Sequence, residues 1–218
     1  MLEFPKTTMF GHRVPKQKFY EYLDIDPEMK RLFVEQIRLI TWINKLSPQT
    51  MNIAAGEQVQ EIEVFEIKLT GEKLDPRVLT LMDRQIPYHI LFLLKRMDGL
   101  CQLVVNYKES SQAGKTAFQL KESYHTDWME AEALPALSMT ALDMDKLYEG
   151  LVRAIAGDQL TAPETESLHD AVAQTQEKEK LRRQIEQLKG KMKREKRLAK
   201  QMELRREIKR LEGCFCDN

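Results

Sequence analysis

Large apolar side chains recur at helical spacing near the start of the chain. They predict an amphipathic helix over residues 28–46, because their period is close to 3.6 residues. Asp26-Pro27 is a helix start signal, and Ser47-Pro48 is a stop, since the residue before a proline is driven out of the α region. We therefore expect N-terminal helices within about residues 15–46. The stripe consists of Leu32, Phe33, Gln36, Ile37, Ile40, Ile43 and Leu46.

The pattern changes to a period of two over residues 61–69, which predicts a strand with Phe65, Ile67 and Leu69 on one face. Asp75 and Pro76 then open a helix that runs to Gln85. Residues 88–94 and 100–107 are nearly continuous apolar runs joined by a Met-Asp-Gly turn, which predicts a β-hairpin.

A further strand is predicted within residues 118–128, so that the sheet spans about residues 61–128, and a last helix is predicted over residues 143–156. The order of these elements predicts an α+β fold, a mainly antiparallel sheet with flanking helices.

A Pro-free, strongly charged segment follows and predicts a long helix or a helical hairpin. Its apolar residues form two seams that are out of phase with one another, Leu181, Ile185, Leu188 and Met192, and then Leu204, Ile208 and Leu211. Such spacing is typical of a coiled-coil seam for a partner helix. Two structures fit the break between the seams: one helix whose seam rotates around its axis, or an antiparallel hairpin bent near residues 197–202.

Charged residues are also unevenly distributed along the chain. Residues 171–218 carry 15 Lys and Arg against 8 Asp and Glu, whereas residues 1–170 carry 19 against 26. We expect a globular body over residues 1–157, a linker over 158–163, a basic arm over 164–212 and a tail over 213–218. The most basic run of the arm contains Lys189, Lys191, Lys193, Arg194, Lys196, Arg197 and Lys200. This run is either a face that contacts the phosphates of double-stranded DNA or a solvated helix face.

Composition excludes several classes of protein. No apolar run approaches the roughly 20 residues of a membrane-spanning helix, and charges at Glu3 and Lys6 occupy the place of a signal peptide's apolar stretch. Three cysteines are too few for a disulfide framework and suit a reducing compartment. We therefore expect a cytoplasmic protein that does not associate with membranes.

Few residues suggest catalysis. Glu66-Ile67-Lys68 places a carboxylate and a lysine on one face of a strand, as metal-dependent nucleases do, and Glu61 or Asp83 is a candidate for a further ligand. No preceding strand is predicted to bear the Asp that such a site needs. Gly114-Lys115-Thr116 lacks the first glycine of a phosphate-binding loop. The four histidines are scattered, and Cys214 and Cys216 supply only two ligands. We assign no catalytic residue, metal or cofactor.

Several motifs together resemble an uncharacterised bacterial family, domain of unknown function number 4391. They are Val14-Pro15-Lys16, the stretch from Trp42 to Pro48, Val64-Phe65-Glu66-Ile67, the stretch from Ile86 to Phe92, Tyr107-Lys108-Glu109 and Thr126-Asp127-Trp128. The resemblance covers nearly the whole chain. It implies a genomic context beside helicases and DNA methyltransferases in restriction-like, antiviral defence clusters.

Three functions remain open. The first is a non-catalytic accessory subunit that docks on a helicase or methyltransferase, or on DNA, through its basic arm. The second is a metal-dependent nuclease that uses Glu66 and Lys68. The third is a self-associating structural protein, a homo-oligomer in which the arm of one copy lies against the acidic body of another.

Overall fold

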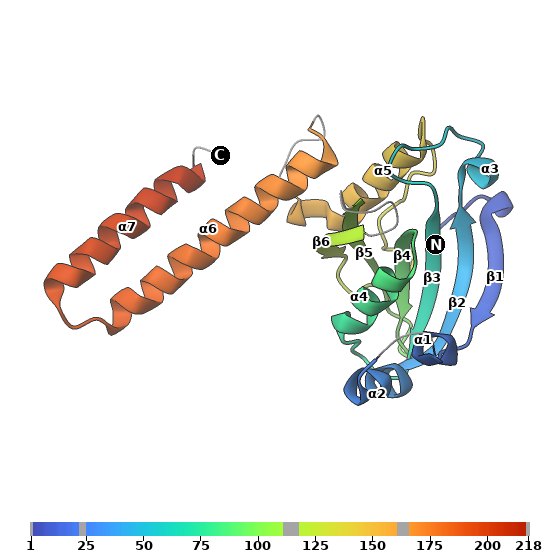
Figure 1. Cartoon of the computed structure of the whole chain (residues 1–218), viewed down its shortest axis with the longest axis horizontal. Coiled ribbons are helices and arrows are strands. Elements are labelled where there is room, and N and C mark those ends of the chain that lie inside the picture. Colours follow the sequence, from blue (N-terminus) through green and yellow to red (C-terminus); the bar gives the residue numbers. More distant parts are fainter. Residues whose placement is uncertain (1, 22–24, 111–117, 161–165, 217–218) are drawn as a thin grey trace. The chain divides into compact units, whose positions relative to one another are not determined.

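The computed structural model describes residues 2–21, 25–110, 118–160 and 166–216 (Figure 1). The chain forms two compact units, Met1–Gly157 and Asp158–Asn218. Residues 161–163 of the predicted linker lie outside the described residues, and so does the Gly114-Lys115-Thr116 segment. None of the helices in the described part is long and apolar enough to span a bilayer.

The first unit is built on a six-stranded sheet whose spatial order follows the chain order throughout (Figure 1). Neighbouring strands are antiparallel except for β3 and β4, which are parallel. The predicted α+β class with a mainly antiparallel sheet is confirmed. The strands are β1 (Met9–Val14), β2 (Ile37–Leu46), β3 (Ile62–Leu69), β4 (His89–Lys95), β5 (Cys101–Ser110) and β6 (Phe118–His125).

Within the described residues, five α-helices accompany the sheet: α1 (Gln17–Glu21), α2 (Pro27–Gln36), α3 (Pro48–Met51), α4 (Pro76–Gln85) and α5 (Met144–Ala156). Short 3-10 turns lie at Lys6–Thr8 and Gly157–Gln159. Asp26, Asp75 and Asp143 cap α2, α4 and α5, each accepting a hydrogen bond from a backbone N–H of the first turn. Helix α4 provides the crossover that the parallel pair β3 and β4 requires.

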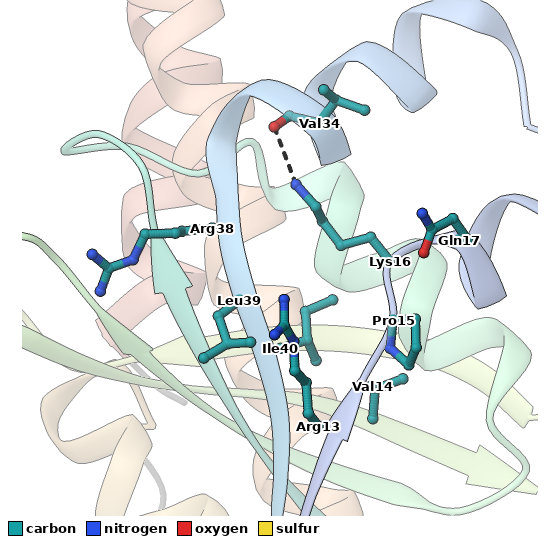
Figure 2. A pocket seen from close by; sticks show the side chains of 9 residues that line it. All are labelled: Arg13, Val14, Pro15, Lys16, Gln17, Val34, Arg38, Leu39 and Ile40. Carbon is teal, nitrogen blue, oxygen red and sulfur yellow. Dashed lines mark hydrogen bonds between the residues drawn. The ribbon is translucent and has the colours of Figure 1, made fainter.

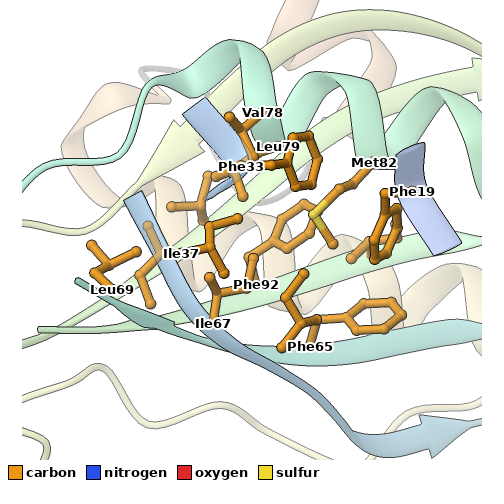
Figure 3. Close-up of a cluster of buried hydrophobic side chains, with 14 of the residues drawn as sticks. Phe19, Phe33, Ile37, Phe65, Ile67, Leu69, Val78, Leu79, Met82 and Phe92 are labelled. Atoms are coloured by element: carbon orange, nitrogen blue, oxygen red, sulfur yellow. The ribbon is translucent and has the colours of Figure 1, made fainter. Parts of the chain in front are cut away.

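The main core lies between one face of the sheet and helices α1, α2 and α4 (Figure 3). Phe65, Ile67 and Leu69 project from β3 into it, as their alternation predicts, and Phe33 of α2 and Met82 of α4 cover them. Ile90, Phe92 and Val104 of the predicted β-hairpin are buried. Helix α5 packs on β5 and β6, and its Tyr148 ring lies 4.3 Å from the ring of His89.

The prediction of one helix over residues 28–46 is wrong in its second half. The helix ends at Gln36, and Ile37–Leu46 forms β2. Register shifts interrupt the pairing of β2 with β3 between Ile37 and Leu39 and between Trp42 and Asn44. A bulge adds a residue to one strand, so inward-facing side chains fall three apart instead of two. Buried Ile37 and Ile40 therefore have a spacing that resembles a helix.

The edge strand β1 was not predicted from the sequence. Its side chains are exposed along most of its length, so it carries no apolar alternation. Gly11 has a φ of +67°, within a register shift of β1 against β2 between Met9 and His12. A glycine in this conformation is typical of a bulge that interrupts a sheet edge.

The second unit contains α6 (Leu168–Arg194) and α7 (Leu198–Cys216), which form a helical hairpin (Figure 1). Of the two structures that the sequence left open, the hairpin is confirmed. Its turn, residues 195–197, lies at the start of the predicted bend. Ile185 of α6 and Ile208 of α7 are both buried, and an ion pair of 2.9 Å joins Lys189 to Glu212.

Candidate nucleic-acid interface

The hairpin turn is built by the one acidic residue of the basic run. Glu195 leaves the helical conformation, and its carboxylate accepts hydrogen bonds of 3.0 Å from the backbone N–H groups of Lys196 and Arg197. Gln201 of α7 donates to the Glu195 carbonyl oxygen at 2.6 Å. The carboxylate thus occupies the N-terminal end of α7, where the exposed N–H groups and the helix dipole favour a negative charge. Glu195 is therefore engaged by the backbone, not by the neighbouring cationic side chains.

Six of the seven predicted phosphate-contacting residues form what we call the tip cations. They are exposed and make no ion pair within the described part of the chain. The seventh, Lys189, differs, because its hydrogen bond to Glu212 raises the pKa of its ammonium group. The tip cations are Lys191, Lys193, Arg194, Lys196, Arg197 and Lys200.

The helix dipole affects the two halves of this group in opposite ways. Lys191, Lys193 and Arg194 lie in the last turn of α6, where positive charge stabilises the helix. Lys196 and Arg197 precede the first turn of α7 and Lys200 lies in it, where positive charge is unfavourable, and that turn holds no acidic residue. Helix stability therefore accounts for the first three cations but not for the second three.

Two large apolar side chains are exposed beside the tip cations. Leu198 is 72% exposed and Met202 is 54% exposed. No aromatic residue lies between residues 189 and 202. The tip can therefore contact a polyanion through charge and aliphatic surface, but it offers no ring on which an unpaired base could stack.

The seam residues lie on the less exposed sides of α6 and α7. Two of them, Ile185 and Ile208, are buried, and the other five are half-buried: Leu181, Leu188, Met192, Leu204 and Leu211. In the hairpin, each helix has the other helix of the same chain as its neighbour. Their predicted role as a seam for a partner from another chain stays a prediction.

At the alternative nuclease site, two lysine side chains pair with the Glu66 carboxylate, the candidate metal ligand. The Glu66 carboxylate lies 3.4 Å from Lys68 Nζ and 2.7 Å from Lys95 Nζ. Asp83 belongs to α4, on the sheet face opposite to Glu66, and Glu61 is paired with Lys45 at 2.8 Å. The structure therefore does not bring Glu61 or Asp83 together with Glu66. Among the described residues, no group of three or more His, Cys, Asp and Glu could hold a metal ion.

Sequence reasoning missed a buried ion pair beneath α4. Lys108 Nζ lies 2.8 Å from Asp83 Oδ1, and both side chains are completely buried. Lys108 also donates to the carbonyl oxygens of Asp83, Ile86 and Tyr88, and Asn106 donates to Asp83 at 2.7 Å. Burial lowers the pKa of Lys108 and raises that of Asp83, while each charge opposes the shift of the other. Because Lys108 bonds the carbonyls at the end of α4, this pair fixes the helix to the sheet.

A second buried carboxylate lies on β3. Glu63 is 1% exposed, and its Oε2 atom has no hydrogen-bond partner among the described residues. Burial, reinforced by the charge of Glu61, raises the pKa of Glu63 to about 7. The sequence could have predicted this burial. Glu63 lies two residues before Phe65 in the alternation that continues with Ile67 and Leu69, so its side chain belongs to the same, buried face of the strand.

The model of a family described as a domain of unknown function (DUF4391) matches residues 2–213. No curated protein and no solved structure matches the chain.

Proposed function

This chain belongs to the DUF4391 family, a domain of unknown function, and from the geometry of its own residues we propose that it is a cytoplasmic accessory protein that binds double-stranded DNA through the tip of its α6–α7 hairpin. In this proposal the protein acts without catalysis of its own. Its body docks on a larger DNA-processing enzyme. The genomic context implied by the resemblance supports a helicase or a DNA methyltransferase in a defence system as that partner.

The observation that carries the proposal is the position of Lys196, Arg197 and Lys200. These cations lie at the N-terminal end of α7, where they oppose the helix dipole, and they have no acidic partner in the described part of the chain. Glu195 already supplies one negative charge at this helix end, and a phosphate backbone would add further negative charge beside the three exposed cations.

Duplex DNA is favoured over a single strand for two reasons. The tip carries no aromatic side chain for base stacking. The tip cations also come from the ends of two helices and the turn between them. Several of them can therefore contact backbone phosphates without contacting the edges of the bases. Such contacts release counterions, and the affinity should fall steeply with salt.

The test is the salt dependence of binding to a duplex of arbitrary sequence between about 50 and 200 mM salt. We expect replacement of all six tip cations by glutamine to lower the slope of log affinity against log salt by about 0.9 for each lost phosphate contact. Glutamine keeps the helix, because its helix propensity is close to that of lysine and arginine.

A matched variant keeps the tip and removes the same charge elsewhere on the hairpin, by glutamine at Lys180, Arg182, Arg205, Arg206, Lys209 and Arg210, all of them exposed. The proposal predicts a smaller loss of slope for this variant. Equal loss in both variants would mean that net charge alone drives binding. No loss in the tip variant, or binding to anionic lipid vesicles but not to DNA, would overturn the assignment of the tip to DNA.

The nuclease alternative has its own test. A metal ion at Glu66 would have to displace both Lys68 and Lys95 from the carboxylate. We therefore expect the purified protein to leave duplex DNA intact in Mg²⁺ or Mn²⁺. Cleavage that disappears in Glu66→Ala but persists in Glu72→Ala, an exposed carboxylate, would replace the accessory role with catalysis.

A further inference from the structure

A pocket of about 390 Å³ opens where β1 and β2 separate, beside the end of α2 (Figure 2). The last pair between the strands joins Val14 to Ile40, after which Pro15 turns the chain away. Its walls are largely aliphatic: Val14, Pro15, Val34, Leu39 and Ile40. This volume lies within the range of pockets that hold small molecules in proteins.

Lys16 gives the pocket a fixed wall. Its ammonium group donates to the carbonyl oxygens of Ile37 at 2.6 Å, Val34 at 3.2 Å and Phe33 at 3.4 Å, at the C-terminal end of α2. Figure 2 draws the bond to Val34. These bonds satisfy carbonyls that the helix leaves open. The ammonium group is therefore committed to the protein, while the aliphatic part of Lys16 lines the pocket.

Two arginines complete the lining: the guanidinium group of Arg13 lies near Ile40, whereas that of Arg38 extends away from Lys16 and Pro15 (Figure 2). Arg13 and Arg38 are exposed and form no ion pair with any residue that the structure describes. No carboxylate lines this pocket. Val34, at the rim, is 53% exposed. The pocket therefore combines an aliphatic interior with the exposed guanidinium group of Arg13, and Arg38 lies at its edge.

We propose that this pocket binds a small carboxylate with an unbranched aliphatic body, such as a medium-chain acid. Guanidinium groups match a carboxylate in geometry, because they can donate two parallel hydrogen bonds. The aliphatic walls match methylene groups, whereas no aromatic ring is present to stack on a nucleobase. The site belongs to the body unit, and the inference does not depend on DNA binding by the hairpin.

Isothermal titration calorimetry with butanoate, hexanoate and octanoate tests the proposal on the full chain. We expect the affinity to rise roughly fourfold for each methylene group that the pocket buries. Octanamide, which has the same chain without the charge, should bind at least tenfold more weakly than octanoate.

Two variants identify the site. The double variant Arg13→Gln with Arg38→Gln should lose at least tenfold in octanoate affinity, and Val34→Ser should lose a smaller factor because it shortens the wall. The matched control is Arg31→Gln with Arg84→Gln, which removes two exposed arginines outside the pocket. All these positions are exposed, so the variants should keep the wild-type melting temperature.

Three results would overturn the proposal. They are an affinity independent of chain length, equal binding of octanamide, and equal loss in the control variant. The double variant should also keep the wild-type salt slope for DNA, so that failure of this site and failure of the hairpin interface can be told apart.

Discussion

Lys108 in the sheet and Lys196 in the hairpin turn have the same side chain and opposite environments. The side chain of Lys108 has no exposed surface and contacts one carboxylate oxygen and three carbonyl oxygens. Lys196 is exposed and has no ion pair in the described part of the chain. The body uses its buried cation to fix a helix to a sheet. The hairpin presents its cations to solvent, where a ligand can take the place of an internal partner.

The same contrast extends to the apolar residues. The body buries a continuous cluster between its sheet and three helices. Of the seam residues of the hairpin, only Ile185 and Ile208 are buried, with 7% and 5% of their surfaces exposed. Stability is therefore concentrated in the body, and charge available for binding is concentrated in the hairpin. Four predictions test this division.

The largest effect is expected at Lys108. Lys108→Met leaves the Asp83 carboxylate buried without its ammonium partner, and loss of one member of a buried pair typically costs about 3–5 kcal/mol. Urea unfolding of the full chain measures this cost. The double variant Lys108→Met with Asp83→Leu should recover part of the loss, because no charge remains buried. A single variant as stable as the wild type would show that the pair is not what fixes α4.

A smaller and local effect is expected at Ile208. Ile208→Ala should destabilise the hairpin by about 2–4 kcal/mol through the lost burial. Hydrogen exchange should accelerate at the amides of α6 and α7 while the amides of the sheet keep their protection. Leu198→Ala is the control, because Leu198 is 72% exposed. Faster exchange across the sheet would mean that the two units unfold together.

The next effect is a change in folding stability at Glu63 that is confined to a defined pH range. Its pKa of about 7 in the folded protein lies above the ordinary value of 4.5. The folded state therefore holds this proton more tightly than the unfolded state does. Its contribution to stability is complete below about pH 4.5 and is lost as the pH rises to about 7, a change on the order of 3 kcal/mol.

Glu63→Gln should therefore be more stable than the wild type at pH 8 and similar to it at pH 4. The difference between the two proteins is the quantity to measure, because buried His89, with its pKa lowered to about 3 by burial, contributes in the opposite direction. Glu66→Gln, on the other face of the sheet, should leave the Glu63 contribution in place. A difference that does not change with pH would show that Glu63 is not the titrating group.

The smallest effect on stability is expected at the hairpin tip, although the effect on DNA binding there should be the largest. Glutamine at Lys196, Arg197 and Lys200 should stabilise α7 slightly, whereas glutamine at Lys191, Lys193 and Arg194 should destabilise α6, each by a few tenths of a kcal/mol per residue at low salt. Thermal unfolding at low and high salt compares the two triple variants. Equal effects of the two variants would remove the argument that the α7 cations are kept for a ligand.

Much of the fold could be predicted from the sequence, but the buried ion pair and the pocket could not. Helix α4 has the predicted bounds, since Asp75-Pro76 is a strong local signal, and β3, β4 and β5 follow from their alternation or continuous apolar runs. Strand β2 was mistaken for helix because two bulges altered its period. The Lys108–Asp83 pair was missed because its partners are 25 residues apart and only the fold brings them together. The pocket depends on three separate segments and has no local signal at all.

The order of the strands also bears on how the chain folds during synthesis. Because each strand pairs with the next one along the chain, every new strand that leaves the ribosome finds its neighbour already present. Pairing between close segments lowers the contact order of a sheet and favours rapid folding. The slowest step should be the parallel pair β3 and β4, which must wait for the α4 crossover, while the hairpin forms afterwards from purely local contacts. No inner strand remains unpaired while it waits for a distant partner, and this protects a nascent sheet from aggregation.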